Sequence, residues 1–122
     1  MSGIDFVADT NAVLYLLSGN ICMKPYLEKK LGVSVIAVME LLSFPDIKIE
    51  EETKIRAFLN NCVVLDLNSR VRETTISLRR TYRKKLPDTI IAATAIEAGV
   101  PIITADTGFF NITELSVEKI VP

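Results

Sequence analysis

Short runs of apolar residues alternate with helical patterns along the whole of this 122-residue chain. The expected strands cover residues 4–8, 33–38, 62–67, 101–105 and 117–121. The first of them is apolar at most positions, which is typical of strands that are buried on both faces of a parallel sheet. Strands that alternate with helices predict an α/β fold with a parallel sheet.

Helical patterns fill the segments between these strands. Helices are expected over residues 12–17, 25–31, 39–43, 50–60 and 88–98, and a long one that Asn68 or Ser69 caps runs to about residue 85. The helix over residues 88–98 is almost entirely apolar, so it must be buried on most sides. No repeat or linker divides the chain, and its length suits one hydrophobic core, so residues 1–122 are predicted to form a single domain.

The composition excludes several classes of catalytic site. The chain has no histidine, which removes Ser-His-Asp and Cys-His catalysis and every histidine metal site. Cys22 and Cys62 are far apart and match no CxxC spacing, so we expect reduced core cysteines and no zinc site. Any catalysis must therefore use carboxylates, lysines, hydroxyls or a bound metal.

No segment of the sequence indicates a membrane or a secretion route. The longest apolar stretches are too short to span a bilayer, and the N-terminus lacks the pattern of a signal peptide. We therefore expect a cytoplasmic protein with no membrane partner. Apolar residues make up 49% of the chain, which suggests that some surface is buried against another chain.

Four carboxylates occupy positions that stability alone does not explain. Asp9 and Asp106 follow expected strands, Glu40 interrupts the apolar stretch 33–44, and Asp88 begins the apolar helix. The carboxyl ends of parallel strands meet at one edge of a sheet, where ligands bind. Carboxylates that crowd together cannot all stay ionised without a cation. The pattern therefore predicts a site for Mg²⁺ or Mn²⁺, and with it phosphate chemistry.

Each of these acids also has a purely structural interpretation. Asp9 is a preferred helix cap, Asp88 suits the positive end of a helix, and Asp106 beside Gly108 is a good turn former. Glu40 could lie on the exposed face of a helix. The four together favour a shared site, whereas Asp66, near the end of the third expected strand, is interpreted as a turn or edge residue.

A basic stretch precedes Asp88, although the net charge of the chain is only −1. Two interpretations are open: a solvated helix face, or a rim that contacts phosphates and brings RNA toward the acids. Two interpretations are also open for Tyr26 and Tyr82, which could stack on bases or pack within the fold. The basic residues are Arg79, Arg80, Arg83, Lys84 and Lys85.

Four segments of the chain resemble the PIN-domain nucleases, and more narrowly the small VapC-type toxins of prokaryotic toxin–antitoxin pairs. They are Asp-Thr-Asn at 9–11, Val-Met-Glu-Leu at 38–41, Leu-Pro-Asp-Thr-Ile-Ile-Ala-Ala-Thr-Ala at 86–95 and Ile-Thr-Ala-Asp-Thr-Gly-Phe at 103–109. The resemblance extends from residue 6 to residue 109, and the segment 86–95 is its most specific part.

The resemblance implies a three-layer α/β/α fold with about five parallel strands in the order 3-2-1-4-5. It implies a Mg²⁺- or Mn²⁺-dependent endoribonuclease that cleaves RNA phosphodiester bonds by metal-activated water. It also implies a homodimer and a cognate antitoxin. The family's acidic residues, which are catalytic and hold the metal, match Asp9, Glu40, Asp88 and Asp106. Its supporting polar residues match Asn11 and Thr104, whose hydroxyl is expected to hold an acid or a metal-bound water.

Two functions of other classes remain as alternatives. The first is a non-catalytic interaction module that uses its apolar surface for protein contacts. The second is a receiver-like phosphoacceptor domain, which also depends on Mg²⁺. A receiver needs an acidic pair after its first strand and a lysine after its fifth, but here Asp9 is single and Lys119 lies within the last expected strand.

Overall fold

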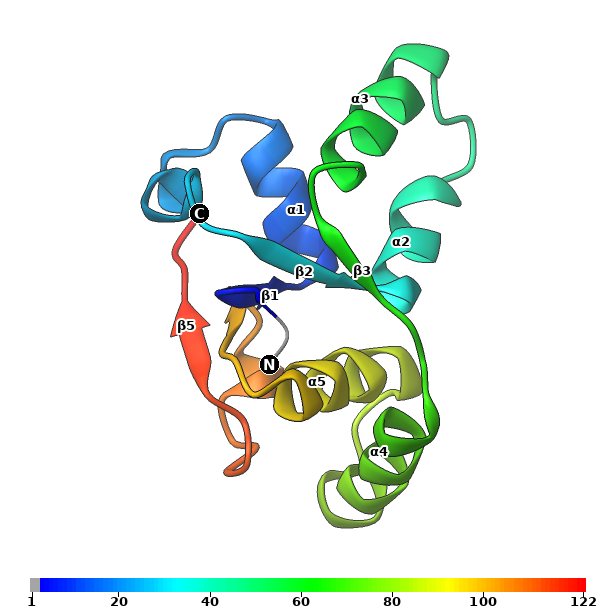
Figure 1. The fold of residues 1–122 in the computed structure, drawn as a ribbon, viewed down its shortest axis with the longest axis vertical. Coiled ribbons are helices and arrows are strands. Elements are labelled where there is room, and N and C mark those ends of the chain that lie inside the picture. The colour runs from blue at the N-terminus through cyan, green and yellow to red at the C-terminus, as the bar shows by residue number, and fades with distance from the viewer. Residues whose placement is uncertain (1–2) are drawn as a thin grey trace.

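The computed structural model describes residues 3–122. Its centre is a sheet of five strands, all parallel, in the order β3-β2-β1-β4-β5 (Figure 1). The predicted α/β class and strand order are therefore confirmed. The strands are β1 Phe6–Ala8, β2 Leu31–Ser34, β3 Val63–Leu65, β4 Ile102–Thr104 and β5 Val117–Lys119.

Helices cover both faces of the sheet and make the predicted three layers. In Figure 1, α1, α2 and α3 lie on one side of the strands, and α4 and α5 lie together on the other. Two 3₁₀ helices, η1 and η2, complete the described elements. Their bounds are α1 Thr10–Leu17, η1 Ile21–Tyr26, α2 Val35–Leu42, α3 Ile49–Leu59, α4 Ser69–Tyr82, α5 Leu86–Ala98 and η2 Thr107–Phe109.

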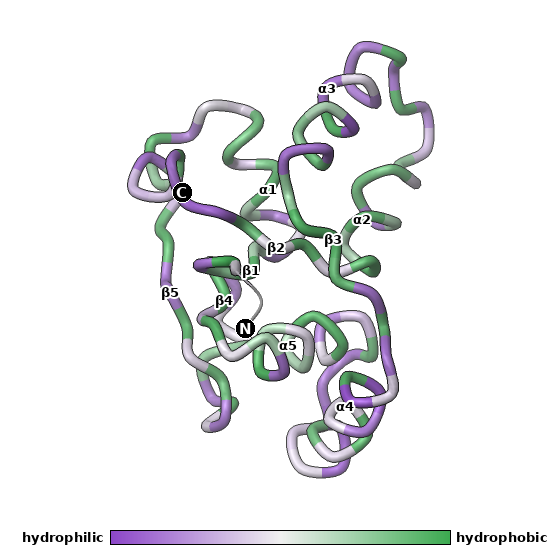
Figure 2. Tube along the Cα trace, viewed as in Figure 1, coloured by the Kyte–Doolittle hydropathy of each residue, from purple (hydrophilic) through white to green (hydrophobic). Residues whose placement is uncertain are grey.

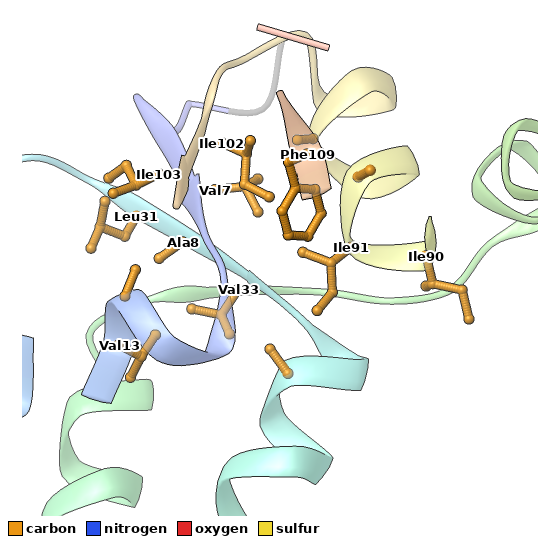
Figure 3. Packing of buried hydrophobic residues seen from close by; sticks show 14 of the residues in the cluster. Val7, Ala8, Val13, Leu31, Val33, Ile90, Ile91, Ile102, Ile103 and Phe109 are labelled. Carbon is orange, nitrogen blue, oxygen red and sulfur yellow. The ribbon is translucent and has the colours of Figure 1, made fainter. Parts of the chain in front are cut away.

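The core lies on both faces of the central strands, against α1 and α2 on one side and α5 on the other (Figure 3). Val7 in β1 and Ile102 and Ile103 in β4 are fully buried. Every residue of α5 from Thr89 to Ala95 is buried, as its apolar sequence predicts. Figure 2 shows hydrophobic residues along the strands and α5, whereas α4 carries many hydrophilic ones. Within residues 3–122, none of the helices combines the length and the hydropathy that crossing a bilayer requires.

Short polar side chains set where several helices begin. The side chains of Asp9, Ser34 and Asn68 each accept a hydrogen bond from a backbone N–H in the first turn of α1, α2 and α4. Gly99 ends α5 in the left-handed conformation, with φ of 71°. These caps place the first turn of each helix directly after a strand or loop.

Several expected boundaries were wrong, each for a local reason. The strand expected over 33–38 ends at Ser34, whose hydroxyl accepts from Ile36 N–H at 3.1 Å and starts α2. The helix expected over 25–31 is instead η1, which Asn20 caps. The long helix expected to reach residue 85 stops at Tyr82, because Arg83 adopts a left-handed conformation with φ of 55°.

Candidate active site

The four predicted carboxylates line one cavity at the carboxyl ends of the central strands. Asp9 follows β1, Asp106 follows β4, Glu40 lies in α2 and Asp88 lies in the first turn of α5. Phe109 and Ile91, which also line this cavity, lie next to one another in Figure 3. The volume is about 250 Å³, and the lining residues are Asp9, Thr10, Asn11, Glu40, Phe44, Asp88, Ile91, Asp106 and Phe109.

Asp9 is the most buried of the four acids, with 5% of its surface exposed. Its Oδ1 accepts from Ala12 N–H at 2.8 Å and caps α1, while its Oδ2 accepts from the Thr104 hydroxyl at 2.5 Å. The structural and the functional interpretation of Asp9 are therefore compatible, because one carboxylate starts a helix and lines the cavity.

The Thr104 hydroxyl joins two of the acids. Thr104 is fully buried, and besides donating to Asp9 it accepts from the backbone N–H of Asp106 at 3.0 Å. Asp106 Oδ1 in turn accepts from Gly108 N–H at 2.8 Å and caps η2. A Cβ atom on Gly108 would lie 3.1 Å from that oxygen, so glycine fits this close turn best.

Glu40 is fixed by a residue that sequence reasoning missed. Its Oε1 accepts from the Thr10 hydroxyl at 2.6 Å, which ties α2 to the start of α1. The only sequence signal for Thr10 was its place between Asp9 and Asn11. Within residues 3–122, Asp88 accepts no hydrogen bond through its side chain, so its carboxylate is available to a ligand.

The charges in the cavity repel one another. The pKa of Asp9 is raised, mainly by burial and further by Asp106 and Asp88, although the hydrogen bonds from Thr104 and Ala12 oppose the shift. Burial also raises the pKa of Asp88, with Asp106 and Glu40 adding to the effect. Lys85 partly offsets that shift.

No acid of the cavity has an ion-pair partner in the described chain. The ion pairs within residues 3–122 join Arg56 to Glu52 on α3 and Arg72 to Glu73 on α4. No ion pair of the described chain therefore neutralises the cavity, and only the charge of Lys85 partly compensates at Asp88.

The donor set fits a hard divalent cation. Carboxylates, hydroxyls and an amide are the oxygen donors that Mg²⁺ and Mn²⁺ prefer, and a cation would relieve the repulsion among the acids. Across residues 3–122, no three acidic or thiol side chains are already grouped closely enough to hold a metal directly. Mg²⁺ usually keeps several waters and contacts only one or two carboxylates, so it does not need three such side chains in direct contact.

The predicted basic residues divide between two places. Arg83, Lys84 and Lys85 line a second cavity of about 350 Å³, whose wall also includes Asp88 and Asp106. Arg79 and Arg80 lie on α4 and, with Arg83, line a separate hollow. The structure therefore brings three of the five basic residues beside the acids.

Both tyrosines have partners within the fold. The hydroxyl of the buried Tyr26 donates to Glu118 Oε1 at 2.8 Å, and its ring meets Phe6 edge to face at 5.2 Å. Burial, with help from Glu118, raises the pKa of Tyr26 to about 12. Tyr82 donates to Glu114 Oε1 at 2.5 Å. These contacts favour the packing interpretation over base stacking.

The remaining polar candidates lie outside the acidic cavity. Asp66 is exposed and lines a different hollow, and Lys119 points its ammonium at the ring of Phe110, 5.5 Å from the centroid. The position of Lys119 disfavours a receiver-like site. Cys22 and Cys62 are free thiols, but they are half-buried at the margin of the core.

Several solved structures share this fold. One from a toxin–antitoxin complex of Klebsiella pneumoniae has a TM-score of 0.81 and 29% identity, covering 94% of this chain and 97% of that one. VapBC2 of Rickettsia felis, bound to a promoter DNA fragment, has a TM-score of 0.82 and 19% identity over 97% and 100% of the chains. VapBC-1 of nontypeable Haemophilus influenzae has a TM-score of 0.80 and 21% identity over 95% and 98%.

A search among curated proteins gave no match. The family comparison is decisive, because the model of the PIN domain matches residues 6–115, which include every acid of the cavity. This chain belongs to the PIN domain family.

Proposed function

We propose that this protein is a Mg²⁺- or Mn²⁺-dependent endoribonuclease and the toxin of a toxin–antitoxin pair. The observation that carries the proposal is the cavity lined by four carboxylates, with no cationic side chain among its described walls. Membership of the PIN domain family supports nuclease activity. The similar structure from Klebsiella pneumoniae is a toxin–antitoxin complex, which supports an antitoxin partner.

Asp9 and Asp106 are the residues that we assign as direct ligands of the cation, with Asp88 and Glu40 as further ligands or as acceptors for water. When bound, the cation supplies Lewis-acid activation of water and of a phosphoryl oxygen. Thr104 keeps the Asp9 carboxylate oriented and favours its ionised form, because its hydrogen bond opposes the effect of burial. Asn11 lines the same cavity and supplies an amide beside Asp9.

Glu40 and Asp88 are suited to handle the water that attacks the phosphorus. The bond from Thr10 occupies Glu40 Oε1, which leaves Oε2 to accept from that water. The Asp88 carboxylate lines the same cavity and accepts no hydrogen bond within residues 3–122, which leaves it free to accept from that water as well. Arg83, Lys84 and Lys85, which lie beside the acids, would hold RNA by its phosphates.

The partners in this proposal are RNA, an antitoxin and a second copy of the chain, and the setting is the cytoplasm, where RNA is translated. Exposed apolar side chains are available for protein contacts, including Ile21 and Ile49, which are 79% and 81% exposed. The same surface supports the alternative of a PIN-like interaction module without catalysis, and the experiment below separates the two.

Calorimetric titration with Mn²⁺ and cleavage of RNA with and without EDTA test the assignment. The variants are Asp9→Asn and Asp106→Asn, since asparagine keeps an acceptor for the backbone bonds of each residue. Asp66→Asn is the matched control, because it removes a carboxylate outside the cavity.

The wild type and Asp66→Asn should bind Mn²⁺ and cleave RNA, and neither cavity variant should do so. Wild-type protein that binds no Mn²⁺ would favour the interaction module. For the toxin role, expression of the wild type but not of Asp9→Asn should arrest growth of the host, and unimpaired growth with active nuclease would contradict that role.

A further inference from the structure

The second cavity adjoins the acidic one and carries the opposite charge along one wall. Arg83, Lys84 and Lys85 line it, and it shares Asp88, Asp106 and Phe109 with the acidic cavity. We call residues 83–85 the basic turn, because they connect α4 to α5. A ligand that fills the second cavity would therefore extend directly into the acidic one.

Hydrogen bonds hold the backbone of the basic turn in place. The Arg83 N–H donates to Arg79 O at 3.1 Å, and Arg79 Nε donates to Lys84 O at 3.2 Å. Lys85 O accepts from both the N–H and the hydroxyl of Thr89, at 3.0 and 2.8 Å. Arg83 also keeps a left-handed φ of 55°, a conformation that costs energy for any residue other than glycine.

In contrast to its backbone, the cationic side-chain groups of the basic turn form no hydrogen bonds or ion pairs within residues 3–122. Within residues 3–122, none of its three cations forms an ion pair, since both ion pairs lie elsewhere on α3 and α4. A fixed backbone with free cationic side chains is pre-organised for an anion, because the backbone gives up little freedom when the anion binds.

Part of the lining is apolar, and the chain that follows it is fastened to the same end of α4. Phe109 and Ile112 form this apolar part and are both buried. The chain that follows is held by Tyr82, whose hydroxyl donates to Glu114 at 2.5 Å and accepts from Thr113 N–H at 3.2 Å. The basic turn and the apolar part of the lining are therefore fixed relative to each other through α4.

We propose that this second cavity is a subsite for one nucleotide of single-stranded RNA next to the scissile bond. The basic turn binds its phosphate, and the apolar part of the lining receives the sugar or base. The volume of about 350 Å³ lies at the small end of the range for ligand sites, which suits one unpaired nucleotide. The inference rests on the proposed nuclease function and gives the two cavities separate tasks, phosphate capture and cleavage.

The subsite divides the basic residues by role. Arg79 is a positioning residue, because its guanidinium holds the Lys84 carbonyl. Arg80 has no part in the subsite, because it does not line the second cavity and lines only the other hollow. Arg83 and Lys84 are the residues to change, whereas Lys85 stays intact because it acts on the pKa of Asp88.

The test is fluorescence anisotropy with a labelled oligouridylate in EDTA, so that binding is measured without cleavage. The double variant Arg83→Asn with Lys84→Gln removes both charges, and asparagine tolerates the left-handed conformation. Its affinity should fall roughly tenfold to a hundredfold, the effect of removing charge-assisted hydrogen bonds. The slope of log K against log salt should become shallower by about 0.7 for each RNA phosphate that the variant no longer neutralises.

Arg80→Gln is the matched control, since it removes one exposed charge from the same stretch and should leave affinity nearly unchanged. A series of oligonucleotides, each with one uncharged methylphosphonate linkage at a different position, locates the bound phosphate. One position of the linkage should weaken binding to the wild type, and the same oligonucleotide should bind the double variant no more weakly than the unmodified one. The subsite would be overturned if the double variant kept the affinity and the salt dependence of the wild type. It would also be overturned if Arg80→Gln lost as much affinity as the double variant.

Titration with Mn²⁺ keeps the two proposals apart, because the double variant retains all four acids and should bind the ion like the wild type. If the wild type neither binds Mn²⁺ nor cleaves RNA while the difference in RNA affinity persists, the nuclease proposal fails and the phosphate site stands. If the wild type cleaves RNA and the double variant binds RNA equally well, only the subsite fails.

Discussion

Replacing Thr104 with valine tests whether one buried hydroxyl holds the acidic cavity together. Valine has nearly the same shape, so the substitution removes two hydrogen bonds without leaving a void. The first is the donation to Asp9 Oδ2 at 2.5 Å, and the second is the bond accepted from Asp106 N–H at 3.0 Å. Any decrease in stability therefore reports on these two bonds and not on packing.

The expected cost follows from the two bonds. A hydrogen bond to an ionised group contributes about 1.5–3 kcal/mol. The N–H of Asp106 loses its acceptor, but Asp106 is exposed and water can replace the bond, so this adds less than about 1 kcal/mol. The free energy of unfolding should fall by about 2–4 kcal/mol, and Tm by about 10 °C for a chain of this size.

The destabilisation should also depend on pH. Without the Thr104 hydroxyl the pKa of Asp9 rises further, because the bond that opposes burial is gone. The folded state is then penalised most near neutral pH, where Asp9 must be ionised, and least at acidic pH, where it is protonated. Urea unfolding of the metal-free wild type and Thr104→Val, once near neutral pH and once at acidic pH, measures the destabilisation and its dependence on pH.

Thr94→Val provides the matched control. Thr94 is also buried, but its hydroxyl donates to Ile90 O, at 2.7 Å, within α5. That carbonyl keeps its helical partner, so the cost should be below about 1 kcal/mol. Equal stability of Thr104→Val and Thr94→Val near neutral pH, or a Thr104→Val penalty that does not shrink at acidic pH, would refute the reasoning.

Three further outcomes are expected. Tyr26→Phe should cost about 1 kcal/mol in urea unfolding and leave RNA cleavage intact, and abolished cleavage would contradict this role. The wild type should lose more stability than the variant as pH rises from 10.0 to about 12, because the unfolded tyrosine ionises first. The raised pKa values of Asp9 and Asp88 mean that metal-free folded protein binds extra protons on the acidic side of neutral. The free energy of unfolding of the wild type should therefore rise as pH falls, and that of Asp88→Asn should rise less. Mn²⁺ should raise Tm at neutral pH. A stability that does not depend on pH and is identical in the wild type and Asp88→Asn would contradict this expectation. Arg83→Gly should raise the free energy of unfolding by up to about 1 kcal/mol, because glycine adopts the left-handed conformation freely, while RNA binding weakens; a marked drop in Tm would show that the side chain stabilises the turn.

The alternation of strands and helices was sufficient to predict the fold class, and the positions of Asp9 and Asp106 were sufficient to predict that they meet. Both follow parallel strands, and the carboxyl ends of such strands share one edge. The order of the strands in the sheet could not be predicted in this way, because hydrophobic periodicity does not distinguish one sheet topology from another. The order 3-2-1-4-5 came with the resemblance and not from the pattern itself.

The boundary between β2 and α2 shows where local preference fails. Val35, Ile36 and Val38 favour a strand by intrinsic preference, yet all three lie in α2. A short apolar run fits a buried helix as well as a strand, and here the Ser34 cap and the packing of α2 decide for the helix.

The basic stretch shows a second limit. In sequence its five cations are near neighbours, and nothing in their pattern separates them. The separation comes from the left-handed conformation of Arg83, which ends α4 and directs residues 83–85 toward the second cavity. Arginine has no preference for that conformation, so only the tertiary structure reveals which cations lie beside the acids.

The hydrogen bond between Thr104 and Asp9 joins positions that are 95 residues apart in the chain. During synthesis, Asp9, Glu40 and Asp88 are made before β4, which inserts beside β1 and brings Thr104 and Asp106. A nascent or prematurely terminated polypeptide that lacks β4 therefore has no assembled cavity. The proposed nuclease would therefore become active only once nearly the whole domain has been translated.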